Sequence, residues 1–147
     1  MNKISIVYWS NGGNVEMMAN AIADGARVNK ADVNVKHVVD VSIEELAEAD
    51  AIALGSPAMV DDDIEQIDMK PFVNSLKGLN FDKKPLVLFG SSGWRDDKFI
   101  HKWAAQMEDC GFEVIGKLAV KESLSKEEIK IAENLGSTLV NIVNKSC

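Results

Sequence analysis

The sequence is poor in the features that mark several large classes of protein. Only two cysteines occur among 147 residues, and their positions, Cys110 and Cys147, give neither a disulfide framework nor a Cys-x-x-Cys metal motif. The two histidines lie far apart, which argues against a zinc site as well. No uninterrupted apolar run exceeds four residues, so no segment is expected to span a bilayer.

Basic residues are also in the minority. Lysine and arginine number 16 against 23 aspartates and glutamates, which leaves a formal net charge of −7. Binding to nucleic acid requires a basic patch, so we expect no nucleic-acid partner. The chain begins Met1-Asn2-Lys3 and enters an apolar run at once, so we expect no signal peptide and a cytoplasmic protein. Its 147 residues are the size of one domain.

Short apolar runs recur along the chain and predict strands. Near-continuous runs are typical of strands that are buried on both faces of a parallel sheet. A stretch in which apolar and polar residues alternate predicts a strand nearer the edge of the sheet. The near-continuous runs are Ile4–Trp9, Ala51–Leu54 and Leu86–Phe89, and the alternating stretch is Val33–His37. A fifth strand region is Phe112–Val120, interrupted at Gly116 and Lys117.

Helical patterns fill the intervals between these strands. Apolar residues recur at spacings of three and four, which places them on one face of a helix. Ser125 precedes Glu128 by three residues, a capping-box pattern that predicts a helix start, and Pro71 suits a first helical position. Strands that alternate with helices predict an α/β fold, a doubly wound five-stranded parallel sheet with helices on both faces. The predicted helices are Val15–Ala26, Ile100–Met107 and Ile129–Val143, with Asp40–Ala47 and Pro71–Lys77 as shorter ones.

The loops that follow three of the strands are candidate binding sites, because ligands of open α/β sheets bind beyond the carboxyl ends of the strands. The first loop reads Ser10-Asn11-Gly12-Gly13-Asn14-Val15 and leads directly into a helix. The main-chain N–H groups and the dipole of a helix N-terminus attract an anion. The loop contains no lysine or arginine and no GxxxxGK[ST] pattern, which excludes a nucleoside-triphosphatase loop. An ordinary strand-to-helix turn is an equal alternative.

The other two loops each carry one large side chain among small residues. The second comprises residues 55–63 and contains Met59, and the third comprises residues 90–96 and contains Trp94. A thioether and an indole at adjacent strand ends can enclose a flat aromatic ring between them. Taken singly, each side chain is better explained as a packing residue, so the prediction of a ring site depends on all three loops together.

With the three loops in this order, the sequence resembles the flavodoxins and is closest to their short-chain, clostridial type. The resemblance covers essentially the whole chain, and the fifth strand has no room for the insertion that marks long-chain flavodoxins. It implies one domain over residues 1–147, the strand order 2-1-3-4-5 and flavin mononucleotide (FMN) as cofactor. The motifs that carry it are Tyr8-Trp9-Ser10, Ala58-Met59 and Gly93-Trp94.

The resemblance also implies which residues bind FMN. The residues that would hold the phosphate are Ser10, Asn11, Gly12, Gly13, Asn14 and Val15. In the second loop, the residues that would line the inner face of the ring are Ser56, Ala58 and Met59. The Val60–Asp61 peptide would accept a hydrogen bond from N5 of the reduced flavin, and Asp62 would lie near N3. Those of the third loop are Trp94, stacked on the outer face, and Ser91, Ser92 and Gly93 at the polar edge of the ring.

Four positions depart from the pattern of the family. Gly12 and Val15 stand where threonines are usual, which predicts weaker phosphate binding, since a hydrogen bond to a charged group is worth about 1.5–3 kcal/mol. Val60 stands where the family has a glycine, in the peptide that would turn to accept the hydrogen bond from reduced flavin. A β-branched residue restricts that turn. Arg95 replaces another glycine, where it would either raise the potential of the reduced flavin or pair with a neighbouring aspartate in solvent.

The function expected from the resemblance is one-electron transfer at low potential, with FMN shuttling between its semiquinone and hydroquinone and with no substrate turnover by the protein. Negative charge near the ring would disfavour the anionic hydroquinone. It would also steer redox partner proteins, a reductase or an oxidoreductase of the ferredoxin-using type, into short-lived contact with a monomeric carrier. The acidic residues expected around the flavin are Asp61, Asp62, Asp63, Glu65 and Asp68.

Two other functions remain open. A flavodoxin-like, FMN-dependent NAD(P)H:quinone or flavin reductase would need a substrate pocket over the ring, where Trp94 is expected to lie. A flavin-free interaction module would account for the altered phosphate loop and for Val60. Rapid NADH oxidation would favour the enzyme, and a yellow purified protein would exclude the module. A response-regulator receiver domain is excluded, because Trp9-Ser10 and Gly55-Ser56 stand where it needs acidic residues.

Overall fold

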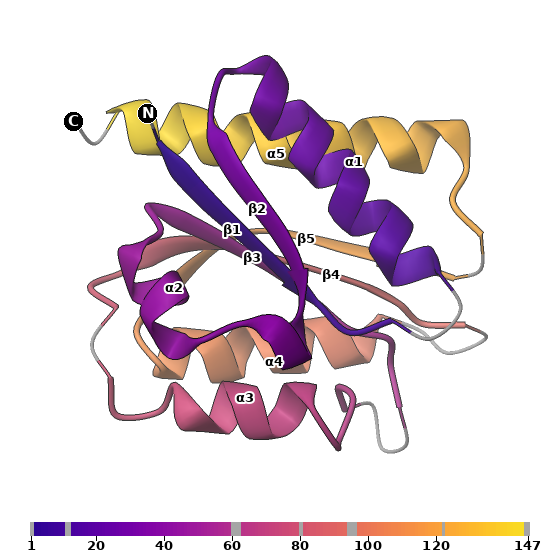
Figure 1. The fold of residues 1–147 in the computed structure, drawn as a ribbon. Helices are drawn as coiled ribbons and strands as arrows, with labels where there is room; N and C mark the ends of the chain where they lie inside the picture. The colour runs from indigo at the N-terminus through magenta and orange to yellow at the C-terminus, as the bar shows by residue number, and fades with distance from the viewer. Residues whose placement is uncertain are drawn as a thin grey trace.

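Five parallel strands form one central sheet in the computed structural model (Figure 1). The structure describes residues 2–10, 13–59, 63–79, 81–93, 97–121 and 123–145. The order across the sheet is β2-β1-β3-β4-β5 and every neighbouring pair is parallel, which confirms the predicted doubly wound sheet and its strand order. The strands are β1 (Lys3–Tyr8), β2 (Asp32–His37), β3 (Ala51–Gly55), β4 (Lys84–Ser91) and β5 (Phe112–Val120).

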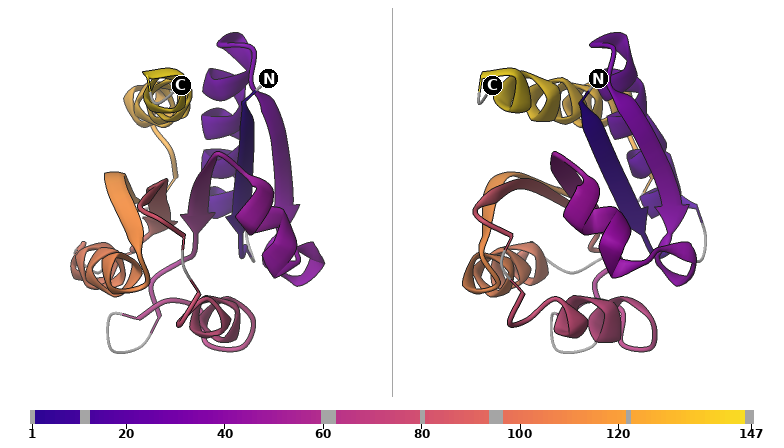
Figure 2. Two further views of the ribbon diagram at one scale, coloured as in Figure 1. Left: turned by 90° about the vertical axis from the view of Figure 1, so that its left-hand side faces the viewer. Right: turned by 60° about the vertical axis from the view of Figure 1, so that its left-hand side comes forward.

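Helices cover both faces of this sheet, as the edge-on views in Figure 2 show. Two layers of buried apolar side chains result, one on each side of the strands. Among the described residues, no helix combines the length and the apolar character needed to cross a membrane. On one face lie α1 (Asn14–Val28) and α5 (Lys126–Lys145), and on the other lie α2 (Ile43–Glu48), α3 (Met69–Ser75) and α4 (Lys98–Asp109), with a 3₁₀ turn at Val38–Asp40.

The apolar pattern explains which strands are central. All five residues of β3 are buried, and so are the middle residues of β1 and β4, because helices cover these strands from both sides. β2 alternates exposed and half-buried residues, as predicted for an edge strand. β5 continues through Gly116, where the prediction placed an interruption. The register with β4 shifts just before Gly116, since Leu86 pairs with Val114 and Val87 with Gly116, which leaves Ile115 as the extra residue. Gly116 also leaves room for the side chain of Leu135.

Side-chain caps set the first residues of two helices. The predicted capping box forms at α5, where the Glu128 N–H donates to Ser125 Oγ (3.1 Å) and the Ser125 N–H donates to Glu128 Oε1 (3.0 Å). α2 begins at Ile43 rather than at residue 40, because Ser42 Oγ accepts the N–H of Glu45 (3.3 Å) and caps the helix there.

The start of α3 differs from the prediction. The helix begins at Met69, so the placement of Pro71 in the first helical position was wrong. Pro71 is the third residue of the helix, still within the first turn, where N–H groups have no intrahelical partner. The earlier start follows from Glu65, whose carboxylate accepts the N–H groups of Asp68 and Met69.

Two glycines allow α1 and α5 to cross at close range. A Cβ atom on Gly25 would lie 1.9 Å from the carbonyl oxygen of Glu133, and one on Gly136 would lie 2.0 Å from that of Ile22. Asn29 Nδ2 also donates to the Gly25 carbonyl (2.9 Å) at this crossing. The crossing fixes α1, whose first residues follow the loop at the carboxyl end of β1.

Candidate functional site

Main-chain hydrogen bonds join the carboxyl ends of four strands. They extend the parallel pairing beyond the last residues of β1, β3 and β4, so the loops that follow these strands leave the sheet together. The bonds run from Trp9 N–H to Gly55 O (3.0 Å), Ser56 N–H to Phe89 O (3.1 Å), Ala58 N–H to Ser91 O (2.8 Å) and Ser92 N–H to Val120 O (2.8 Å). The three loops singled out in the sequence therefore begin at one edge of the sheet.

The first loop ends in an open helix N-terminus. Gly13, the residue before α1, has φ +97°, a left-handed conformation that favours glycine, and no side chain caps the helix among the described residues. The N–H of Gly13 donates to Ser10 Oγ (3.2 Å), which leaves the Ser10 hydroxyl proton available to a ligand. The side chain of Val15 is buried in the core, so only its main chain can serve an anion. Asn11 and Gly12 lie outside the described residues.

The second loop is held by a buried clasp that the sequence patterns did not reveal. Ser56 is fully buried, and its hydroxyl donates to the Pro57 carbonyl (2.9 Å) while accepting the N–H of Glu65 (2.9 Å). Glu65 is only 3% exposed. Its carboxylate accepts three N–H groups, from Ile67 (2.9 Å), Asp68 (2.7 Å) and Met69 (2.8 Å). Glu65 was expected to contribute to an exposed acidic rim, but it is a buried anchor between β3 and α3.

A second set of bonds closes the segment between Met59 and Asp63. The Met59 N–H donates to the Asp63 carbonyl (2.7 Å), and the Asp63 carboxylate is paired with the Lys70 ammonium. Burial raises the pKa of Asp63, but the hydrogen bonds from Lys70 and from the Ile64 N–H outweigh it and hold that pKa below its usual value. Met59 itself is half-buried, and Val60, Asp61 and Asp62 lie outside the described residues.

The third loop begins close to the second. A Cβ atom on Gly90 would lie 2.0 Å from the carbonyl oxygen of Ser56, so a glycine is needed where β4 passes the second loop. Ser92 is buried, Ser91 and Gly93 are half-buried, and Gly93 has φ +62°. Trp94 lies outside the described residues, so its stacking on a ring stays a prediction.

Aromatic side chains flank the first loop at the ends of β1 and β2. The Tyr8 hydroxyl donates to Glu16 Oε1 (3.2 Å), and partial burial together with Glu16 raises the pKa of Tyr8. The His37 ring lies 5.5 Å from the Tyr8 ring and 6.2 Å from the Trp9 ring, measured between centroids. The Trp9 indole N–H donates to Asp68 Oδ2 (3.1 Å), just before α3. Trp9 thus connects the first loop to the second, a contact that the sequence patterns did not predict.

This edge of the sheet fits FMN in its chemistry. The uncapped N-terminus of α1, with Gly13 and the Ser10 hydroxyl beside it, suits a phosphate. The described parts of the other two loops consist mainly of small residues, which would let a flat ring approach the main chain beside Met59. Among the described residues, no group of His, Cys, Asp or Glu side chains is arranged to hold a metal ion.

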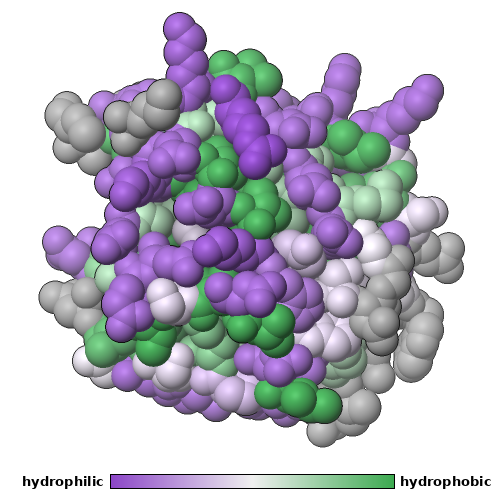
Figure 3. All heavy atoms as spheres, viewed as in Figure 1, coloured by the Kyte–Doolittle hydropathy of each residue, from purple (hydrophilic) through white to green (hydrophobic). Residues whose placement is uncertain are grey.

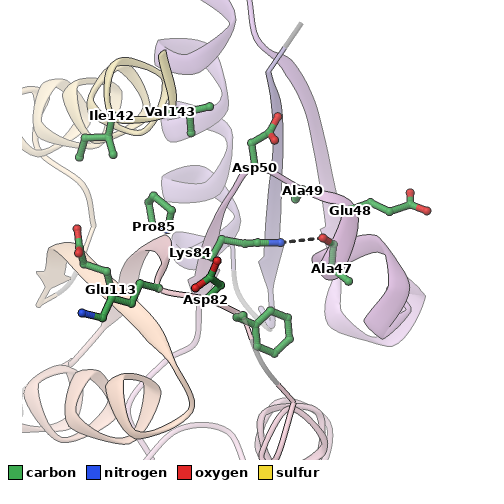
Figure 4. Close-up of a pocket in the computed structure, with 12 residues that line it drawn as sticks. Ala47, Glu48, Ala49, Asp50, Asp82, Lys84, Pro85, Glu113, Ile142 and Val143 are labelled. Atoms are coloured by element: carbon green, nitrogen blue, oxygen red, sulfur yellow. Dashed lines mark hydrogen bonds between the residues drawn. The ribbon is translucent and has the colours of Figure 1, made fainter. Parts of the chain in front are cut away.

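A cavity of about 530 Å³ lies at the opposite end of the sheet, where the strands begin (Figure 4). It is bounded by the end of α2, the start of β4 and the last turns of α5. Lys84 points from β4 toward α2, and its ammonium donates to the carbonyls of Leu46 and Ala47 (2.8 Å each). Burial lowers the pKa of Lys84. The lysine therefore caps the C-terminus of α2, which makes this cavity a structural feature away from the three loops.

Replacing the buried anchor should loosen the second loop. In Glu65→Gln, an amide NH2 group would face main-chain N–H donors, and we expect the free energy of unfolding to fall by about 1–3 kcal/mol. Urea unfolding of the apoprotein measures this. Glu44→Gln, at an exposed position in the first turn of α2, is the matched control. Equal stability of the two variants would contradict the anchoring role.

The Asp63–Lys70 pair should make stability depend on acid pH. Because the folded protein holds the pKa of Asp63 below its unfolded value, the pair stabilises the fold at pH above about 4, and this contribution is lost as pH falls through the folded pKa. We expect Asp63→Asn to be less stable than wild type at neutral pH and to approach it below about pH 4. Chemical unfolding at several pH values tests this, with Asp24→Asn as the exposed control. A stability gap that does not change with pH would contradict it.

Comparison with known proteins gives consistent matches over most of the chain. The sequence model of the flavodoxin family matches residues 6–135. The chain is 34% identical over 139 residues to the flavodoxin of Clostridium beijerinckii, covering 95% of this chain and 100% of that protein. It is 38% identical over 119 residues to the flavodoxin of Megasphaera elsdenii, covering 81% and 86%. The solution structure of the two-electron-reduced Megasphaera elsdenii flavodoxin has a TM-score of 0.82 at 33% identity, over 94% of this chain and 98% of that one.

Two enzymes match over a minor part of their length. The NAD(P)H dehydrogenase (quinone) of Azorhizobium caulinodans is 42% identical over 60 residues, which are 41% of this chain and 30% of that protein. The coenzyme F420H(2) oxidase of Methanothermobacter thermautotrophicus is 28% identical over 148 residues, which cover 97% of this chain and 36% of that protein. The chain therefore belongs to the flavodoxin family and is a flavin-binding electron carrier with FMN as its cofactor.

Proposed function

We propose that residues 1–147 form one FMN-binding domain that carries single electrons at low potential between redox proteins and turns over no substrate of its own. The observation that supports this most directly is the meeting of three small-residue loops at one sheet edge, beside a helix N-terminus that no described side chain caps. Bound FMN supplies the redox chemistry, because its ring accepts and releases electrons one at a time.

The phosphate is held by main-chain groups. The loop of residues 10–15 would surround it with main-chain N–H groups other than that of Gly13, at the start of α1, where the helix dipole favours negative charge. The Ser10 hydroxyl adds a donor, since its oxygen already accepts the Gly13 N–H. No lysine or arginine occurs among residues 10–15, so the binding is electrostatically weaker than in a site with a cation.

The ring is enclosed by the second and third loops. Met59 and Ala58 would lie against its inner face and Trp94 against its outer face, while Ser91, Ser92 and Gly93 would contact its polar edge. The Val60–Asp61 peptide would accept a hydrogen bond from N5–H of the reduced flavin, and Asp62 would lie near N3. The role of Ser56 is to position this loop, because its hydroxyl is fully used in bonds to Pro57 and Glu65.

Negative charge disfavours the second electron and attracts partners. Asp61, Asp62 and Asp68 provide this charge. Asp63 contributes less because it is paired with Lys70, and Glu65 is buried in main-chain bonds. The partners proposed are a reductase or an oxidoreductase of the ferredoxin-using type, which meet a monomeric carrier in the cytoplasm. An excess of seven negative charges over the chain supports steering by basic partner surfaces.

An FMN-dependent NAD(P)H:quinone reductase is the second candidate, because a quinone dehydrogenase matches 60 residues of the chain. Such an enzyme oxidises NADH with a quinone and needs no other protein. A carrier oxidises NADH only when a separate reductase is added. Steady-state NADH oxidation by the FMN-loaded protein alone therefore separates the two functions.

A reductive titration tests the carrier function. We expect stepwise anaerobic addition of dithionite to the FMN-loaded protein to give two separate one-electron steps, with a long-wavelength absorption band that rises during the first and falls during the second. The second midpoint potential should be lower than that of free FMN. A single two-electron step, or rapid turnover of NADH without a reductase, would contradict one-electron carriage.

The phosphate site predicts a difference between FMN and riboflavin. Each hydrogen bond to the phosphate is worth about 1.5–3 kcal/mol, so riboflavin should bind the apoprotein at least about a hundredfold more weakly than FMN. Ser10→Ala should weaken FMN binding about tenfold or more and leave riboflavin binding unchanged. Isothermal titration measures both. An equal loss for the two ligands would show that Ser10 does not contact the phosphate.

A further inference from the structure

Two exposed aliphatic side chains lie close along the chain to the residues that contact Trp9. Val39, in the 3₁₀ turn after β2, is 61% exposed, and Ile67, just before α3, is 80% exposed. His37 and Asp68 connect them to Trp9, since the His37 ring lies 6.2 Å from the indole and Asp68 accepts the indole N–H. We call Val39, Trp9 and Ile67 the Trp9 patch. Figure 3 shows that hydrophobic side chains also reach the surface at several places on the face viewed, among predominantly hydrophilic ones.

The charges around this patch are mainly negative. Asp40 follows Val39 in the chain, and Asp68, which follows Ile67, accepts the Trp9 indole N–H. Glu16 accepts the Tyr8 hydroxyl at the adjoining strand end, and Glu44 is exposed at the start of α2. The neighbouring lysines are neutralised, Lys36 by Glu45 (3.1 Å) and Lys70 by Asp63. His37 also lies here, and its Nδ1 accepts the Val39 N–H (3.4 Å).

We propose that the Trp9 patch is the apolar centre of the docking surface for a redox partner protein, one that presents an aliphatic or aromatic side chain ringed by lysine and arginine. The proposal rests on the proposed electron-carrier function. Charge complementarity selects this occupant, because exposed aliphatic groups between carboxylates match a basic surface with an apolar centre. The patch extends from the first loop toward β2, beyond the residues assigned to the flavin.

The two parts of the surface have separable roles. The carboxylates attract the partner over distance, and salt above about 0.3 M screens this attraction within a few ångströms. The aliphatic side chains act only on contact, and their contribution persists in salt. A small apolar centre with a charged rim is typical of short-lived encounters between redox proteins.

Electron transfer to a model acceptor tests the proposal. Mitochondrial cytochrome c is a suitable probe, because lysines ring its exposed haem edge. The FMN-loaded protein, fully reduced by dithionite, is mixed anaerobically with ferric cytochrome c, and each haem takes up one electron from the flavin. The second-order rate constant is measured by stopped flow at about 0.05 M and about 0.5 M salt for wild type and for the double variant Val39→Ser/Ile67→Ser.

Val28→Ser is the matched control. Val28 is 81% exposed, comparable to Ile67, but it ends α1 at the opposite edge of the sheet, since α1 returns the chain from the end of β1 to the start of β2. The FMN affinity and both midpoint potentials are measured for every variant. They should equal those of wild type, because the Trp9 patch residues that are changed lie outside the loops assigned to the flavin.

We expect the double variant to transfer electrons about tenfold more slowly at both salt concentrations, as follows from partial burial of two aliphatic side chains, with the control unchanged. An unchanged rate for the double variant, or an equal loss in Val28→Ser, would overturn the docking surface while leaving the carrier function intact. A wild-type protein that cannot reduce cytochrome c would instead overturn the proposed function. A dimer in sedimentation experiments that dissociates in the double variant would assign the patch to a second copy of the chain and overturn the proposal.

Discussion

The buried carboxylate of Glu65 fixes the loop on which the candidate site depends. Three main-chain N–H groups at the start of α3 point to it, and its own N–H is bound by the hydroxyl of Ser56 at the end of β3. A charge in the protein interior is tolerated only with such partners. The clasp therefore ties the end of a central strand to the start of a helix, and the segment between them emerges at a fixed place beside β4.

The same edge shows why a parallel sheet suits a cofactor that needs several kinds of contact. Parallel strands deliver their following loops to one side, and main-chain bonds beyond the strand ends keep those loops together. One loop provides a helix N-terminus for an anion, and two provide small residues and main-chain groups for a ring. The Trp9 indole, bonded to Asp68, connects the first loop to the second and reaches the molecular surface between them.

The strands and the longer helices were predictable because their apolar residues repeat with a regular period. The β5 bounds were predicted correctly, and so was the Ser125–Glu128 capping box, because its two residues form a local pattern three positions apart. The start of α3 was not, because it is set by the carboxylate of Glu65, which accepts the N–H groups of Asp68 and Met69, rather than by the preference of Pro71. Glu65 itself was read as a surface charge, since an acidic run gives no indication of which carboxylate will be buried. One signal was present: an acidic residue shortly before a helix suits its N-terminus.

The candidate site was also predictable only in part. The three loops and the FMN cofactor followed from small residues at strand ends and from a family resemblance, and the family matches confirm the cofactor. The internal use of Ser56 could not be read from the sequence, because it depends on how the loop folds back to bring the Glu65 N–H to the serine hydroxyl.

Mapping of FMN binding onto the main chain tests the central claim most directly. Proton–nitrogen correlation NMR spectra of the apoprotein, recorded during titration with FMN, report on every amide. We predict that the largest changes fall on residues 10–15, 56–63 and 91–94, and that the amides around the Lys84 cavity at the opposite edge stay unchanged. Changes centred on residues 47–50 and 81–85 would contradict a flavin site at the carboxyl ends of the strands.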